Sequence, residues 1–253
     1  MTRRYNSQFA GIISAIFISL ALSSPDATAD SSFNCKTAHS ADEKAVCANE
    51  FLASMDALIA KSYLTSDPRF ADKEVVGRAF LHDRAACGSD AVCIAGVQWG
   101  MLVDYDGSRF GALPAWVERY LLAGLERRAE KLAAEQPQKQ NKFPAVPGEC
   151  AMTHIQTITT RGGEELKDDN EGDGVRVTFE SGVSLVDYNR HYGLITDFKF
   201  VKAKDVVALC LVSIPHDCPK GDDRGKTYFV YDATNFPKTD WLMGDSQHSC
   251  GGE

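Results

Sequence analysis

The residues most able to carry chemistry in this chain are cysteines that have a histidine two positions before them. His216 precedes Cys218 and His248 precedes Cys250, and two histidines with two cysteines form a donor set that can hold zinc. In an oxidising compartment the same thiols form disulfides instead. We therefore predict no zinc site, and we expect both histidines to be surface or packing residues.

The eight cysteines all follow residue 29, and they divide into two groups of four. An even number of cysteines in an exported chain predicts four structural disulfides. Each half of the chain has a modest core, and a bridge that closes a loop of about 10 to 15 residues adds roughly 3 kcal/mol. In the second group three pairings are open. The predicted disulfide cysteines are Cys35, Cys47, Cys87, Cys93, Cys150, Cys210, Cys218 and Cys250.

An acidic stretch near residue 170 is the second candidate site. Asp169 to Gly174, with Glu180 further on, nearly has the spacing of an EF-hand calcium loop. An EF-hand needs flanking helices, whereas Val175 to Phe179 alternates like a strand and Arg176 stands where an apolar residue belongs. We predict an acidic hairpin loop without calcium. Its candidate partner contacts are Asp168, Asp169, Glu171 and Asp173.

No motif sets a nucleophile beside a base. Ser246 and Ser249 flank His248, but the chain has no G-x-S-x-G elbow. Carboxylates are too numerous for one pair to be singled out as a glycosidase acid and base. We predict no catalytic residue, no cofactor and no metal, and we interpret the protein as a non-enzyme.

The segment from Cys218 to Lys226 contains glycines and basic residues, as phosphate-binding loops do. It lacks the G-x-x-x-x-G-K-[ST] order that positions backbone donors around a phosphate. We therefore predict a turn in which Arg224 and Lys226 pair with the neighbouring Asp222 and Asp223.

The first 29 residues have the three-part pattern of a secretory signal peptide. Arg3 and Arg4 precede an apolar run from Phe9 to Leu22, and a small-residue site ends at Ala29. The run of about 14 residues is shorter than the roughly 20 that span a bilayer. Cys35 does not follow a small-residue lipobox. We predict a periplasmic or secreted, soluble protein that is not lipidated and has no transmembrane segment after cleavage.

The net charge limits the class of partner. The chain carries a formal charge of −8, which becomes about −9 when residues 1–29 are removed. Nucleic acid is therefore not an expected partner. A basic protein would be drawn to the chain by long-range attraction, although acidity also serves solubility.

Apolar residues recur at spacings of three and four between residues 40 and 135, which predicts a helical region. Ser40 followed by Glu43 has the form of a capping box. Ser89 is expected to cap the fourth helix, and the chain is expected to turn from Asp104 onward. The expected helices cover residues 40–47, 51–65, 72–86, about 90–103 and 114–135. Their expected inward residues include Phe51, Leu52, Met55, Leu58, Ile59, Tyr63, Val75, Val76, Phe80 and Leu81.

Beyond Cys150 the apolar period changes from 3.6 to 2. Val175 to Phe179 and Val183 to Tyr188 flank a turn at Glu180–Gly182, which predicts a hairpin. Six or seven short strands in about 100 residues indicate a small barrel or sandwich. The other expected strands cover residues 152–160, 194–201, 206–213, 227–232 and the surroundings of Trp241.

These elements predict an α+β chain of two domains, a small disulfide-bridged helical domain followed by a small antiparallel β-barrel or sandwich. Three prolines between residues 136 and 149 indicate an exposed linker. The predicted parts are a signal peptide at 1–29, a helical domain at 30–112, a long amphipathic helix at 113–135, the linker at 136–149 and a β-rich domain at 150–253.

Two cysteine pairs, twelve and six positions apart, lie in the segments Phe33–Ala38, Glu43–Cys47 and Phe80–Cys93. These segments resemble the N-terminal domain of the LprI lysozyme-inhibitor family, a DUF1311-type domain, over about residues 33–103. The resemblance implies a helical fold, disulfides Cys35–Cys47 and Cys87–Cys93, and binding and inhibition of lysozyme. The C-terminal half is similar to an uncharacterised module of exported bacterial proteins. The residues that carry this second similarity lie in Cys210–Pro215, Gly221–Lys226 and His248–Gly252.

Three hypotheses for function follow. The first is an exported envelope protein that binds and inhibits a lysozyme or another basic envelope protein, through the acidic loop at 164–173 or the exposed side of the helical pair. The second is a periplasmic scaffold or stress-related protein that binds envelope proteins or cell-wall polymer without inhibition. The third is a hydrolase, which needs a pocket with a base beside His216 or His248.

Overall fold

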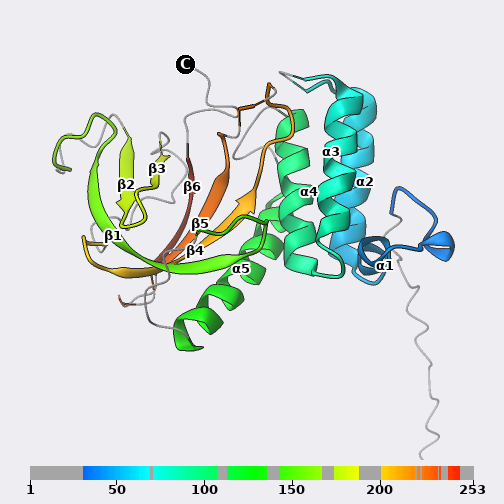
Figure 1. The fold of residues 1–253 in the computed structure, drawn as a ribbon. Coiled ribbons are helices and arrows are strands. Elements are labelled where there is room, and N and C mark those ends of the chain that lie inside the picture. The colour runs from blue at the N-terminus through cyan, green and yellow to red at the C-terminus, as the bar shows by residue number, and fades with distance from the viewer. Residues whose placement is uncertain are drawn as a thin grey trace, which may run out of the picture.

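A computed structural model describes residues 31–68, 71–106, 113–135, 143–166, 174–187, 201–219, 221–222, 224–232, 234 and 239–245 of the chain. Most of the helices gather beside the strands, and the last helix runs beneath them (Figure 1). The predicted signal peptide at 1–29 and all but the last residue of the predicted strand at 194–201 lie outside the described residues.

The helical part begins with a 3₁₀ turn and contains five α-helices in the described residues. The capping box of the first helix is present, because Ser40 Oγ accepts from the amide of Glu43 and the Glu43 carboxylate accepts from the amide of Ser40. Asn49 and Asp72 cap the next two helices through their side chains. The elements are η1 (Cys35–Thr37), α1 (Ala41–Cys47), α2 (Glu50–Thr65), α3 (Lys73–Ala86), α4 (Ala91–Asp106) and α5 (Ala115–Glu135).

Two details of the fourth helix differ from the prediction. The side chain of Asp90, not of Ser89, accepts from the first free amides of α4, those of Val92 and Cys93. The helix also continues to Asp106, although turns were expected from Asp104 onward. Burial of apolar side chains in this last turn, such as the ring of Tyr105, favours helix there over the local turn preference.

Two disulfides lie in the described residues of the helical part. Cys35 is bonded to Cys47 and Cys87 to Cys93, the two pairs that the resemblance implies. The first bridge ties η1 to the end of α1. The second ties the end of α3 to the start of α4, so each bridge fixes a chain reversal between neighbouring helices.

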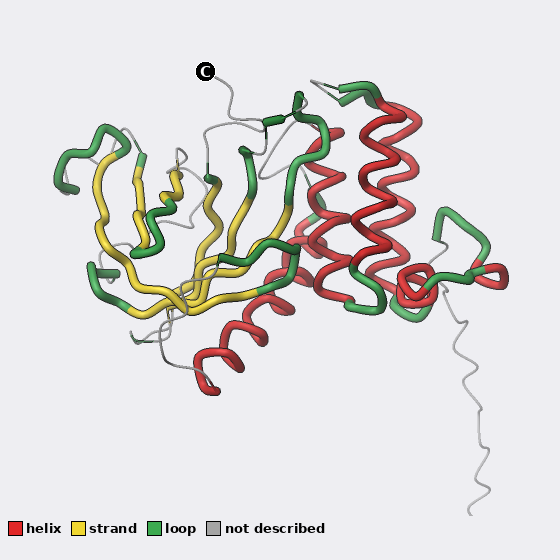
Figure 2. The backbone as a smooth tube through the Cα atoms, viewed as in Figure 1, coloured by secondary structure: helices red, strands yellow, loops and turns green. Residues whose placement is uncertain are grey.

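The strands, yellow in Figure 2, form a closed antiparallel barrel, so of the two expected folds the barrel is present. Their order around the barrel is β1-β2-β3-β6-β5-β4. The predicted hairpin is β2 paired with β3. Cys150 and Cys210 face each other in the pairing of β1 with β4 and are disulfide-bonded. The strands are β1 (Cys150–Thr160), β2 (Val175–Phe179), β3 (Ser184–Asp187), β4 (Val206–Ser213), β5 (Thr227–Asp232) and β6 (Thr239–Gly244).

The barrel has two buried surfaces. In β4, alternate residues such as Leu209 and Leu211 belong to the cluster that fills the barrel, whereas Ala208 and Val212 join the cluster that includes the helices. Because α4 and α5 cover the outer face, β4 and β5 are buried on both faces. This explains why their sequences read as almost continuous apolar runs.

Two glycines allow α4 to lie close to the barrel. A Cβ at Gly96 would lie 2.3 Å from the carbonyl oxygen of Val212, and one at Gly100 would lie 2.9 Å from Cβ of Ser213. The hydrophobic core therefore runs without a break from the helices into the outer face of the barrel. The division into two domains stays a prediction.

The end of the predicted exposed linker is only partly exposed. Phe143 packs edge-on against Phe179 and Tyr228, which belong to the cluster inside the barrel. The amide of Gly148 donates to the carbonyl of Leu211, so the chain is already paired with β4 before β1 begins. Backbone pairing and burial of an aromatic ring favour this docked position over a free linker. Residues 136–142 lie outside the described part.

None of the helices in the described part of the chain is both long and apolar enough to cross a membrane.

Candidate functional site

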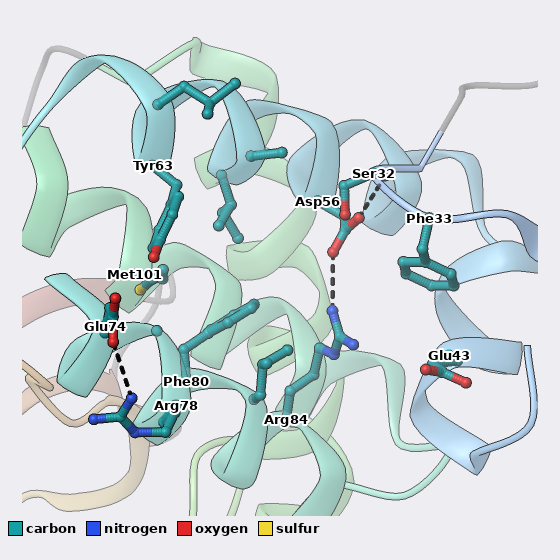
Figure 3. A pocket seen from close by; sticks show the side chains of 15 residues that line it. Ser32, Phe33, Glu43, Asp56, Tyr63, Glu74, Arg78, Phe80, Arg84 and Met101 are labelled. Atoms are coloured by element: carbon teal, nitrogen blue, oxygen red, sulfur yellow. Dashed lines mark hydrogen bonds and ion pairs between the residues drawn. The ribbon is translucent and has the colours of Figure 1, made fainter.

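A groove with a cavity volume of about 680 Å³ lies between α2 and α3 (Figure 3). Both helices pack on α4, whose Met101 forms the floor of the groove. α2 and α3 lie farther from each other than either lies from α4. Its walls are mostly apolar. The apolar side chains that line it are Phe33, Ile59, Ala60, Tyr63, Leu64, Phe80, Leu81 and Met101.

The two walls of the groove present apolar side chains to solvent. Leu64 of α2 is 81% exposed and Leu81 of α3 is 52% exposed. Val75 of α3 is also 48% exposed, so the expectation that Val75 and Leu81 face the core is wrong. The reason is that α3 buries only the narrow stripe of Val76 and Phe80 against its neighbours, and its apolar surface is wider than this stripe.

One end of the groove is closed by an aromatic ring. Tyr63 reaches from α2 to α3, where a Cβ at Gly77 would lie 3.3 Å from its ring. The same ring packs edge-on against Tyr105 of α4, and the ammonium group of Lys73 lies 5.4 Å from its centre. These contacts hold the tyrosine in place, so this end of the groove has a fixed shape.

The other end contains a buried ion-pair cluster. Arg84 of α3 donates from Nε to Asp42 at 2.8 Å and from Nη1 to Asp56 at 2.9 Å. The side chains of all three residues are at least nine-tenths buried. The guanidinium also lies 5.6 Å from the ring centre of Phe33 and 5.4 Å from that of Phe80. The cluster ties α1, α2 and α3 together and carries one more negative than positive charge.

The first described residues of the chain join this cluster. The amide of Ser32 donates to Asp56 at 2.7 Å. Burial alone would raise the pKa of the Asp42 carboxyl, but hydrogen bonds from Ser40 and Arg84 and the charge of Arg84 hold it below its usual range. The Asp42 carboxylate therefore stays ionised at neutral pH and keeps its ion pair with Arg84.

Acidic groups also stand on the rim of the groove. Glu43 lines it near Phe33, and Glu74 lines it near Tyr63 (Figure 3). Arg78 pairs with Glu74 at 3.5 Å, and both side chains are largely exposed. The titratable groups around the groove thus sum to a net negative charge. Chemically the groove suits an apolar surface that also carries positive charge.

A second cluster joins the helices to the barrel. The ring of His216, in the segment after β4, lies 3.2 Å from Asp83 through Nε2 and 3.2 Å from Asp104 through Nδ1. Its side chain is 4% exposed. Both nitrogens can donate only when the imidazole is protonated. Burial lowers the pKa of His216, but the hydrogen bonds and charges of Asp104 and Asp83 outweigh this and raise it to about 9.

This histidine was expected to be a surface or packing residue, and its structural role as a charged clamp was missed. Asp83 lies on α3 and Asp104 on α4, so the ion pairs cross from the barrel to two helices. The hydrolase hypothesis needs a pocket beside a base. The void that borders Asp104 measures about 10 Å³, room for about one water molecule. The geometry therefore supports a clamp here.

The remaining predicted site residues have mixed outcomes. Cys218 is disulfide-bonded, and Arg224 pairs with Asp222 through two hydrogen bonds of 2.9 Å, as expected. Among the described residues, no group of three or more histidine, cysteine, aspartate or glutamate side chains is arranged to hold a metal ion. The predicted residues that lie outside the described part are Asp168, Asp169, Glu171, Asp173, Asp223, Ser246, His248, Ser249 and Cys250.

The sequence contains a signal for the ion-pair cluster that the prediction missed. Arg84 stands four residues after Phe80 and eight after Val76, on the inward stripe of α3. A cation at an inward helical position requires buried carboxylates around it. No comparable signal links His216 to Asp83, because 133 residues separate them.

Three aromatic rings meet where α2 lies against α5. Phe51 stacks on Tyr120 with ring centres 4.8 Å apart and lies 6.2 Å from Trp116. Phe51 is 40% exposed, although it was expected in the core. Asn49 donates to the Tyr120 hydroxyl and holds it in place. The rings form a partly exposed aromatic platform, defined by Phe51, Trp116 and Tyr120.

Comparison of the chain with protein-family profiles, with curated proteins and with solved structures finds no match in any of the three.

Proposed function

We propose that this protein is an exported envelope protein that binds a basic partner, and that it inhibits lysozyme in the manner of the LprI family. The observation that carries the proposal is the groove between α2 and α3, which combines exposed leucines with a net negative lining. The groove lies in the part of the chain that resembles this family. The disulfides support export, because such bonds persist in oxidising compartments.

The physical case rests on two separate effects. The net charge of −8 attracts a basic protein from a distance, which raises the rate of encounter and weakens with added salt. Burial of apolar side chains at the groove then supplies affinity that salt does not remove. An inhibitor built this way has a salt-dependent association rate and a nearly salt-independent dissociation rate.

The test is a titration of the oxidised protein, without residues 1–29, into a lysozyme assay that follows the turbidity of cell walls. Inhibition that saturates near one molecule per lysozyme and weakens at moderate salt supports the proposal. Absence of inhibition for several lysozyme types would remove lysozyme as the partner. Heat-inactivated lysozyme with added protein is the control for changes in turbidity that do not depend on catalysis.

A second candidate function is binding of cell-wall polymer, as a scaffold without inhibition. The aromatic platform favours it, because a partly exposed ring such as that of Phe51 offers an apolar surface to the C–H groups of sugars. Co-sedimentation with purified peptidoglycan tests it. The scaffold function predicts that Phe51→Ala reduces the bound fraction, whereas Val75→Ala, which removes an apolar side chain of similar exposure elsewhere, leaves it unchanged.

A further inference from the structure

We infer that the groove between α2 and α3 takes an amphipathic α-helix of a basic partner protein, which completes a bundle with α2, α3 and α4. This inference rests on the proposed function, because it names the part of the partner that the protein recognises. The inference goes beyond the proposed function because it assigns the binding site and the helical shape of the bound segment.

The geometry of the walls favours a helix in this groove. Three helices surround the groove, with α4 beneath and α2 and α3 at the sides, so a fourth helix position is open. Between Asp56 and Leu64 the α2 wall is about 12 Å long, at 1.5 Å per residue. Apolar residues at positions i, i+3 or i+4, and i+7 of an occupant helix span about 10 Å, which fits this length.

Backbone hydrogen bonding also favours a helical occupant. The walls of the groove are helices, whose backbone groups are already paired within the helix, so an extended peptide would find no strand edge to join. A helical occupant satisfies its own backbone and needs to offer only side chains. The groove therefore selects a helix over an extended segment.

The apolar and charged surfaces of the groove match those of a basic amphipathic helix. Leu64 on the α2 wall is 81% exposed and Leu81 on the α3 wall is 52% exposed, so an apolar stripe that covers both removes their surface from water. Glu43 and Glu74 stand at opposite ends of the groove (Figure 3). Lysine or arginine residues that flank the apolar stripe of the occupant would meet these carboxylates.

The experiment measures binding of a labelled synthetic peptide of about five helical turns, with leucines on one face and lysines elsewhere, by fluorescence anisotropy. One control peptide has the same leucines with glutamate in place of lysine. The other has the composition of the test peptide in an order that removes the apolar face. The protein variants are Leu64→Asn and Leu81→Asn, which change exposed side chains of the groove. Val75→Asn changes an equally exposed apolar side chain of α3 that does not line it.

The inference predicts that the leucine–lysine peptide binds the unaltered protein and Val75→Asn equally and becomes helical by circular dichroism. Each groove variant should bind it roughly tenfold more weakly or worse, because a buried leucine contact is lost. The glutamate peptide should bind at least about tenfold more weakly at low salt. Equal binding of the reordered peptide, or unchanged binding by both groove variants, would overturn the inference.

The lysozyme assay separates this inference from the proposed function. Peptide binding as predicted, without inhibition of lysozyme, would leave the groove as a helix site and remove the proposed inhibitor role. Inhibition that Leu64→Asn and Leu81→Asn do not weaken would keep the inhibitor role and overturn the groove as its contact.

Discussion

Replacement of His216 by glutamine should destabilise the protein and remove part of its pH dependence. The imidazole is buried between Asp83 and Asp104 and has its pKa raised from the ordinary 6.5 to about 9. A rise of this size corresponds to about 3 kcal/mol of stability, at 1.36 kcal/mol per unit. Glutamine can donate from its amide nitrogen toward one aspartate, but it places an acceptor oxygen where the second ring nitrogen was and carries no charge, so it cannot replace this contribution.

The sign of the pH effect follows from linkage. A group whose pKa is raised on folding contributes its full stability below its unfolded pKa, and loses it as the pH rises through its folded pKa. The contribution of His216 should therefore be complete below about pH 6.5 and disappear by about pH 9. Asp83 acts in the opposite direction, because the hydrogen bond with His216 lowers its pKa and its contribution is lost in acid.

The assay is urea unfolding of the oxidised protein at several pH values between 6 and 9.5, followed by circular dichroism. His216→Gln should be about 3 kcal/mol less stable than the unaltered protein near pH 6, and the two should converge toward pH 9.5. His82→Gln is the matched control, since its ring also contacts Asp83 but is 83% exposed. A constant difference between His216→Gln and the unaltered protein over this range would refute the clamp.

Three further predictions concern the parts that hold the groove and the barrel in place. Arg84→Met leaves two carboxylates buried without a cation and should lower the unfolding free energy by about 3 to 5 kcal/mol, measured by urea unfolding at pH 7. Gly96→Ala places a methyl group against a barrel carbonyl and should lower the melting temperature, with a loss of about 3 kcal/mol. Replacement of Cys150 and Cys210 by serine opens a bridge between residues 60 apart and should cost about 4 kcal/mol, measured against the intact protein under oxidising conditions.

Much of the secondary structure could be predicted because local signals and tertiary packing agree. β4 and β5 have the predicted bounds of 206–213 and 227–232, since each is an apolar run that ends at turn residues. The capping box at Ser40 started α1 as expected. Prediction was less accurate where packing against another element determines where a helix ends. At Asp104 the chain was expected to turn, but burial of the helix end prolongs α4.

The candidate site was harder to predict than the fold. The exposed side of the helical pair was one of two proposed contacts, but nothing in the periodicity of α3 separates exposed Leu81 from buried Phe80. Both belong to the wide apolar surface of α3, and only the arrangement of α2, α3 and α4 decides which one remains exposed. The contacts of His216 depend on how the barrel sits against the helices, which no local pattern records.

The most direct test of the proposed contact is hydrogen–deuterium exchange of the oxidised protein with and without a lysozyme that it inhibits. The account predicts slower amide exchange at the walls of the groove, in α2 (Glu50–Thr65) and α3 (Lys73–Ala86), while the barrel strands exchange at unchanged rates. Protection confined to the barrel or to residues 164–173, with α2 and α3 unchanged, would contradict the account and place the contact elsewhere.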